Sequence, residues 1–352
     1  MTVQPLPFMH RLRRNCRWSS VLLAVVLGSP IAAIAQDAAK PKAWKLSVAV
    51  GPAFALGKAA EAWAKLVAEK SGGSLVVDIN PGATLALRDP DREFAALRDG
   101  AADLAVGSTL HWSTQVPELA VVGLPWLAPE PNELAALATG AVKDRLFAAI
   151  ERAGAVPLAL APLGHRALAA RSKAIRVPDD IRGLKVRITS GRFLVDFYTG
   201  LGALPFAMPF SEAANRFRSG GLDAQEGPIA TFAAARLDSL GLRDVTLWDG
   251  VAEIAIFAVN RAVWEGWSAN QRAQIGSAAQ EAAKELTRFA DAERDSALAT
   301  LKGRDVSVLR LTASGRAAFA AAARPVYDKW AAIAGEDLVR DAESAVKAAS
   351  PP

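Results

Sequence analysis

Cysteine and histidine are scarce in this chain of 352 residues, and so are clusters of metal-binding side chains. Its one cysteine, Cys16, cannot form a disulfide within the chain, so folding must rest on a buried apolar core. A hydrophobic content of 51% and a charged content of 22% allow such a core. No His/Cys/Asp cluster has the spacing of metal ligands. We therefore predict neither a metal site nor a cofactor.

Motifs of catalysis are missing as well. The sequence has no G-x-S-x-G elbow, no Walker A loop and no G-x-G-x-x-G fingerprint. Acidic residues such as Asp103, Asp223 and Glu226 occur, but no two are paired by the sequence for general acid–base work. We predict that the protein is not an enzyme.

Excess positive charge is concentrated at the start of the chain. The formal net charge is +5, and four arginines without any acidic neighbour lie before residue 36; without them the charge would be +1. These four are Arg11, Arg13, Arg14 and Arg17. The rest of the chain has no Lys/Arg cluster of the kind that binds a phosphate backbone, so we predict no nucleic-acid partner.

Residues 1–35 have the three parts of a secretory signal. A basic segment ends at Arg17, an apolar run covers 21–27, and small residues at 33–35 suit a signal peptidase. The apolar run is shorter than the roughly 20 residues of a membrane span. We predict a cleaved signal peptide and a mature periplasmic chain from Gln36; an uncleaved anchor is the alternative.

Strand and helix patterns alternate along the mature chain. We expect strands at 44–50, 75–79, 104–106, 154–161 and 184–188, and helices at 58–70, 92–97, 193–201 and 210–219. This alternation indicates parallel pairing and an α/β fold, and the chain length favours two lobes. A helical stretch from 263 to about 300 is long enough to pass from one lobe to the other. A final helical stretch covers 313–349.

Arg187 ends the run GLKVR, residues 183–187, and lies near the carboxyl end of the apolar strand expected at 184–188. An arginine at the carboxyl end of a strand can hold a carboxylate through two charge-assisted hydrogen bonds, and such strand ends face the cleft of an α/β protein. From composition alone, a solvated surface arginine is the more common role.

The segment DIRGLKVR, residues 180–187, resembles a motif of receptors of tripartite ATP-independent periplasmic (TRAP) transporters of the dicarboxylate-receptor (DctP) type. Further blocks resemble that family in the same order, and together they cover nearly all of residues 44–345. These blocks are 69–73, 97–104, 116–127, 201–212, 222–228 and 259–264. Any one block is weak evidence, whereas their shared order and spacing are specific.

The resemblance implies a two-lobed periplasmic binding protein fold with a long helix spanning both lobes. We expect lobe I at 36–162, lobe II at 163–262, and the spanning and C-terminal helices at 263–352. It also implies a receptor that binds a small organic acid between the lobes and delivers it to TRAP membrane subunits. We expect this receptor to be a monomer, although the sequence leaves its oligomeric state open. A receptor of another uptake or sensing system with the same two-lobed fold is the alternative.

Site residues can be carried over from the family position by position. Arg187 is similar to the arginine that clamps the ligand carboxylate, and Arg166 resembles a second, supporting arginine. Phe210 matches an aromatic residue that packs on the ligand. Gly227 stands where many members have an asparagine that hydrogen-bonds the ligand. Gly107 stands where sialic-acid receptors have a glutamate, so we do not expect sialic acid.

The two glycines predict a bulkier or less polar acid than a short sugar acid or dicarboxylate. Trp112 and Trp126 lie near Gly107 in sequence and could form an aromatic wall, although core packing is the more common role of such side chains. His111 could donate a hydrogen bond to the ligand, although a surface position is the simpler expectation.

Overall fold

The computed structural model describes residues 43–171, 173–189 and 191–350. The predicted signal peptide and Cys16 lie outside these residues. The strands are β1 (Ala43–Val48), β2 (Val76–Pro81), β3 (Leu104–Ser108), β4 (Ala155–Ala170), β5 (Lys185–Ile188), β6 (Leu204–Ala207), β7 (Ala224–Pro228), β8 (Asp244–Leu247), β9 (Ala252–Asn260) and β10 (Ser307–Arg310). The helices are α1 (Ala55–Lys70), α2 (Glu93–Arg98), α3 (Thr109–Trp112), α4 (Pro131–Leu137), α5 (Gly140–Arg152), α6 (Pro178–Ile181), α7 (Arg192–Gly200), α8 (Phe210–Arg218), α9 (Ile229–Ala234), α10 (Arg261–Gly266), α11 (Ala269–Lys302), α12 (Ala313–Ala322), α13 (Arg324–Ala334) and α14 (Glu336–Ala349).

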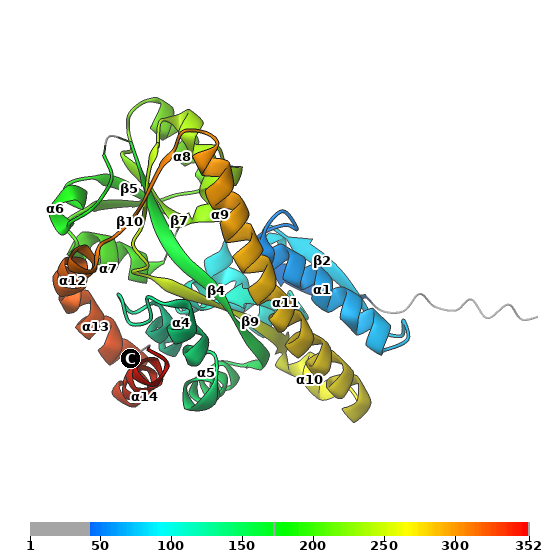
Figure 1. Ribbon diagram of the computed structural model, residues 1–352. Coiled ribbons are helices and arrows are strands. Elements are labelled where there is room, and N and C mark those ends of the chain that lie inside the picture. The colour runs from blue at the N-terminus through cyan, green and yellow to red at the C-terminus, as the bar shows by residue number, and fades with distance from the viewer. Residues whose placement is uncertain (1–42, 172, 190, 351–352) are drawn as a thin grey trace, which may run out of the picture. The chain divides into compact units, whose positions relative to one another are not determined.

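The long strand β4 takes part in two sheets (Figure 1). Its first part, up to His165, pairs with β9 and completes sheet A, whose order is β2-β1-β3-β9-β4. Its second part begins at Arg166, pairs with β7 and β8, and belongs to sheet B, which also contains β5, β6 and β10. One strand therefore connects the two sheets at the His165–Arg166 step.

The observed pairing is mixed rather than purely parallel. The expected parallel pairs form between β1 and β2, β1 and β3, β5 and β7, and β5 and β6. β9 pairs antiparallel with β3 and β4, and β4 also pairs antiparallel with β7. β9 is buried along its whole length, and although it lies in the range expected for lobe II, its partners β3 and β4 place it in sheet A.

The long helix predicted from 263 to about 300 is present as α10 and α11. The chain turns at Trp267, and Ser268 starts α11 with a capping box in which its hydroxyl accepts a bond from the backbone of Gln271. α11 packs on α1 and β4 and, toward its other end, on α9 and β10 (Figure 1). It thus contacts elements of both sheets, which confirms the spanning helix. Of the helices that the structure describes, none combines the length and apolar character that crossing a bilayer demands.

The predicted C-terminal helical stretch is divided into α12, α13 and α14. Pro325 occupies the first turn of α13, where its missing N–H costs no helical hydrogen bond. Gly335, at a φ of 102°, separates α13 from α14 in a backbone region that favours glycine. These two residues mark breaks that the helical periodicity alone does not show.

Candidate functional site

A cavity of about 200 Å³ lies where sheet A and sheet B meet at β4. Residues at or just beyond the carboxyl ends of β1, β3, β5 and β7 line it, together with residues from β4, β9, α9 and α11. The crevice beyond the carboxyl ends of parallel strands is the usual ligand site of open α/β sheets. Its polar lining includes Ser108, His111, Arg166, Arg187, Thr189, Glu226, Glu253 and Glu293.

Arg187, near the end of β5, reaches this cavity as a nearly buried cation with 8% of its surface exposed. Its Nε and Nη2 donate to the carbonyl oxygen of Met208 at 3.0 and 2.8 Å. Its Nη1 has no hydrogen-bond partner among the residues that the structure describes, and no carboxylate there forms an ion pair with it. Burial lowers the pKa of Arg187 and the charge of Glu226 raises it, but a guanidinium stays charged in any case. Its charge is therefore available to an anionic ligand.

Arg166 also lines the cavity, but its guanidinium is already occupied. Nε and Nη2 donate to Glu226 at 2.6 and 2.8 Å, and Nη1 donates to Glu253. Burial lowers the pKa of Arg166, but the two carboxylates outweigh it and raise that pKa above its usual value. Since Glu226 lies on β7 of sheet B and Glu253 on β9 of sheet A, Arg166 joins the two sheets where β4 passes between them. A supporting role for Arg166 suits this geometry better than a second free carboxylate clamp.

His111, on α3, lines the cavity. The simpler expectation from the sequence was a position on the outer surface. Its Nδ1 lies 2.7 Å from Oδ1 of Asp91. Burial lowers the pKa of His111, but the hydrogen bond to Asp91 and the charges of Glu253 and Asp91 raise it more, so the pKa lies above its usual value. His111 thus tends to add positive charge to the cavity wall.

Gly227 lines the cavity, whereas Gly107 packs against a tryptophan ring in the core. Gly227 has a φ of 150°, a backbone conformation that side chains disfavour, so an asparagine here would be strained. A Cβ on Gly107 would lie 2.1 Å from the Trp112 ring, because that ring packs directly on the glycine. The absent side chain at 107 therefore gives room to Trp112 and not to a ligand.

The aromatic residues named from the sequence lie outside the cavity lining. Trp112 is fully buried and packs edge-on against Phe94 at 5.2 Å. Trp126 is partly buried in the same core, where its indole N–H donates to the Trp248 carbonyl. Phe210 is partly buried at the start of α8, against the apolar core of sheet B. None of the three is among the described residues that line the cavity, where Phe54 contributes the aromatic ring.

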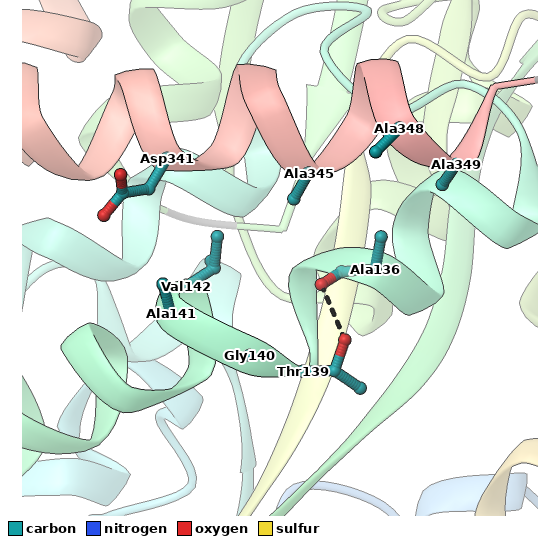
Figure 2. A pocket seen from close by; sticks show the side chains of 9 residues that line it. All are labelled: Ala136, Thr139, Gly140, Ala141, Val142, Asp341, Ala345, Ala348 and Ala349. Carbon is teal, nitrogen blue, oxygen red and sulfur yellow. Dashed lines mark hydrogen bonds between the residues drawn. The ribbon is translucent and has the colours of Figure 1, made fainter.

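Elsewhere in the described chain, a second hollow is a weaker candidate for a ligand site. This hollow of about 320 Å³ lies between α14 and the α4–α5 region, and small side chains line most of it (Figure 2). Its charged lining residue, Asp341, already pairs with Arg145 at 2.5 Å. Among the described residues, no group of three or more His, Cys, Asp or Glu side chains could hold a metal ion. The cavity around Arg187 is therefore the stronger candidate.

A buried acid, Glu93, is the first residue of α2. Glu93 is 1% exposed and accepts a 2.8 Å hydrogen bond from the Ser47 hydroxyl. Burial raises the pKa of Glu93 from 4.5 to about 7, against smaller lowering effects that include the Ser47 bond and the charge of His111.

We expect this acid to give the protein a specific pH dependence. Between pH 4.5 and 7 the unfolded chain has lost a proton that folded Glu93 retains, so stability falls as pH rises through this window, by about 3 kcal/mol. Glu93→Gln keeps a neutral acceptor for Ser47 and should lack this part of the decline. Urea unfolding at pH 5 and pH 8 measures the difference for both proteins. Equal declines in the two proteins would contradict the assignment to Glu93.

The comparison with known families decides what this chain is. A family model described as bacterial extracellular solute-binding protein, family 7 (DctP), matches residues 46–333. The chain belongs to this family. This confirms the family that the ordered motifs predict, and it makes the protein a solute-binding receptor of a periplasmic family rather than an enzyme.

Similar proteins include the C4-dicarboxylate-binding periplasmic protein DctP of Rhodobacter capsulatus, 28% identical over 89% of this chain and 92% of that protein. A crystal structure of a TRAP periplasmic solute-binding protein from Ralstonia eutropha H16, with bound (S)-2-acetolactate, is 38% identical. Its TM-score is 0.83, over 87% of this chain and 98% of that chain. Another TRAP solute-binding protein, from Sulfurospirillum deleyianum with bound succinate, is 25% identical with a TM-score of 0.76, over 86% and 98% of the two chains.

Proposed function

We propose that this receptor binds a small organic carboxylate in the cavity at β4, with Arg187 as the principal contact of the carboxylate. The observation that carries the proposal is a nearly buried guanidinium with an unused donor and no carboxylate partner among the described residues. Charge-assisted hydrogen bonds to a carboxylate would satisfy it. The organic acids named with the relatives from Ralstonia eutropha and Sulfurospirillum deleyianum support the same ligand class.

The ligand that fits this cavity is a small acid. A volume of about 200 Å³ is below the range of roughly 300–1,000 Å³ typical of sites for drug-sized molecules. The expectation of a bulky or aromatic acid rested on two glycines and two tryptophans, and of these four only Gly227 lines the cavity. We therefore favour an acid of about the size of those named with the relatives.

Binding would couple to a movement of the two sheets. Arg187 comes from sheet B, while Ser108 and His111 come from the sheet A side, and all three line one cavity. A ligand that touches both sides would favour the state in which they are close together, because only that state has both sets of contacts.

Delivery and location belong to the same proposal. We propose that the receptor acts as a monomer in the periplasm after cleavage of a signal peptide at residues 1–35. It would hand its ligand to TRAP membrane subunits. The sequence pattern of residues 1–35 and the family's TRAP relatives support this.

Thermal unfolding of the chain from Gln36 onward, with a panel of small mono- and dicarboxylates, tests the ligand class. A ligand at a hundred times its Kd should stabilise the protein by about 2.7 kcal/mol and raise the Tm by about 5 °C or more. We expect such a rise for at least one small carboxylate and none for matched amides. A rise for neutral sugars or amines, with none for any acid, would contradict the proposal.

A further inference from the structure

Glu293 brings a carboxylate from the long helix α11 into the wall of the same cavity that Arg187 lines. One oxygen, Oε2, accepts a hydrogen bond from the backbone N–H of Ala55, the first residue of α1, at 3.1 Å. The side chain is partly buried, and burial raises its pKa, against the lowering effects of the Ala55 bond and the charge of Lys58. Two segments far apart in sequence therefore fix this carboxylate at the cavity.

The pairing of Glu293 differs from that of the other two glutamates of the cavity. Glu226 and Glu253 are both bonded to Arg166. No lysine, arginine or histidine among the described residues forms an ion pair with Glu293, and no described residue donates a hydrogen bond to its Oε1. The second oxygen of this partly buried carboxylate is therefore free to accept a hydrogen bond from a ligand.

Two residues of the cavity lining can each form a further hydrogen bond, one as a donor and the other as an acceptor. Arg187 has a spare donor for an acceptor, and Glu293 has a spare acceptor for a donor. A second carboxylate or a keto oxygen near Glu293 would meet lone pairs and negative charge. A hydroxyl or ammonium group would form a hydrogen bond that the charge on Glu293 strengthens.

We propose that Glu293 is a specificity-determining residue that accepts a hydrogen bond from a donor group of the ligand, so that the preferred ligand is a small carboxylate bearing a hydroxyl or ammonium group. This rests on the proposed function, since it assumes that the carboxylate of the ligand is held by Arg187. Hydroxy acids and amino acids share this donor chemistry, and the experiment separates them.

A purely structural role for Glu293 is the competing explanation. Its bond to Ala55 supports the start of α1, and it also lines a neighbouring hollow with Lys58 and Arg304. Loss of that support would weaken binding of every ligand by a similar factor. A specificity role changes the ratio between ligands with and without the donor, so the ratio is the decisive quantity.

The experiment uses isothermal titration of the chain from Gln36 onward with three carbon skeletons: propanoate, 3-methylbutanoate and butanedioate. Each is tested unsubstituted, as the 2-hydroxy acid, as the 2-amino acid and as the 2-oxo acid, and the two monocarboxylates are also tested as the 3-hydroxy acid. On the skeleton that binds best, we expect a hydroxy or amino form to bind at least about tenfold more tightly than the unsubstituted and 2-oxo forms. Preference for the hydroxy form or for the amino form identifies the donor.

Variants then assign that preference to Glu293. In Glu293→Leu the ratio between donor-bearing and unsubstituted acid should fall to about one, and in Glu293→Gln it should be intermediate because a neutral acceptor remains. Asp291→Asn, an exposed site two residues earlier on α11, is the matched control and should keep the ratio of the native chain.

Two results would overturn the inference while leaving the proposed function intact. One is a native chain that binds unsubstituted or 2-oxo acids as tightly as their hydroxy and amino forms. The other is a Glu293→Leu variant that keeps the native ratio even though its affinity falls. In both cases acids would still bind and still require Arg187. Failure of all the acids to bind would instead contradict the proposed function together with the inference.

Discussion

Replacing Arg187 by alanine should weaken binding of the carboxylate ligand by at least about a hundredfold. Hydrogen bonds to a charged group contribute about 1.5–3 kcal/mol each, and each 1.4 kcal/mol is a factor of ten in Kd. The variant would also leave the ligand carboxylate in a cavity that contains Glu293, while the other lining arginine, Arg166, is already paired with Glu226 and Glu253. Isothermal titration of native and variant chains with the best acid from the thermal screen measures the loss.

Two further variants show whether the loss comes from the guanidinium itself. Arg187→Lys keeps the positive charge but cannot present a planar fork, so we expect an intermediate loss of about tenfold. Arg182→Ala removes an exposed arginine just before β5 and should leave the Kd unchanged. A native Kd in Arg187→Ala would show that another group holds the carboxylate.

The stability of Arg187→Ala must be measured in parallel, because this arginine also supports the backbone. Its two bonds to the Met208 carbonyl join β5 to the segment that follows β6. Loss of those bonds lowers the Tm of the free protein, whereas loss of the ligand contact lowers the ligand-induced rise in Tm. A full loss of the ligand-induced rise in a variant that still unfolds cooperatively assigns the effect to binding.

Periodic apolar patterns and turn residues were sufficient to predict much of the fold. The strand patterns at 44–50, 75–79, 104–106 and 184–188 correspond to β1, β2, β3 and β5. The position of β9 could not be predicted in the same way, because a strand buried on both faces does not reveal which neighbours it pairs with. Its antiparallel place between β3 and β4 is a property of the tertiary fold.

The place of Arg187 at the cavity was predictable from the sequence. Arg187 follows from its strand end and from the family motif, and the structure places it in the cavity wall. Glu253 and Glu293 had no local signal, because β9 and α11 reach the cavity only after the sheets and the long helix have packed. Trp112 shows the converse: its sequence neighbourhood suggests the cavity, but its ring packs on Gly107 within the core.

Replacing Arg166 by methionine should destabilise the protein strongly, by about 3–5 kcal/mol. The change removes the cation that Glu226 and Glu253 share and leaves two nearly buried carboxylates without it, since their side chains are only 0% and 6% exposed. A loss of this size corresponds to a fall in Tm of about 10 °C. By contrast, Arg152→Met removes an exposed ion pair with Glu118 and should cost less than about 1 kcal/mol.

The pH dependence of the Arg166 variant identifies the unpaired carboxylates as the cause. In the native protein burial raises the pKa of Glu253, but Arg166 and His111 outweigh this effect and hold that pKa below 4.5. The stabilisation that the Glu253 carboxylate gains from these positive charges is therefore complete above pH 4.5 and is lost as pH falls through the folded pKa. Without Arg166 burial dominates, Glu253 takes up a proton in mild acid, and the destabilisation should be smaller at pH 5 than at pH 8. Adding Glu226→Gln and Glu253→Gln should restore most of the stability, because neutral amides need no buried cation. Equal losses at both pH values, with no recovery in the triple variant, would show that Arg166 stabilises through packing of its side chain and not by joining the charges of the two sheets.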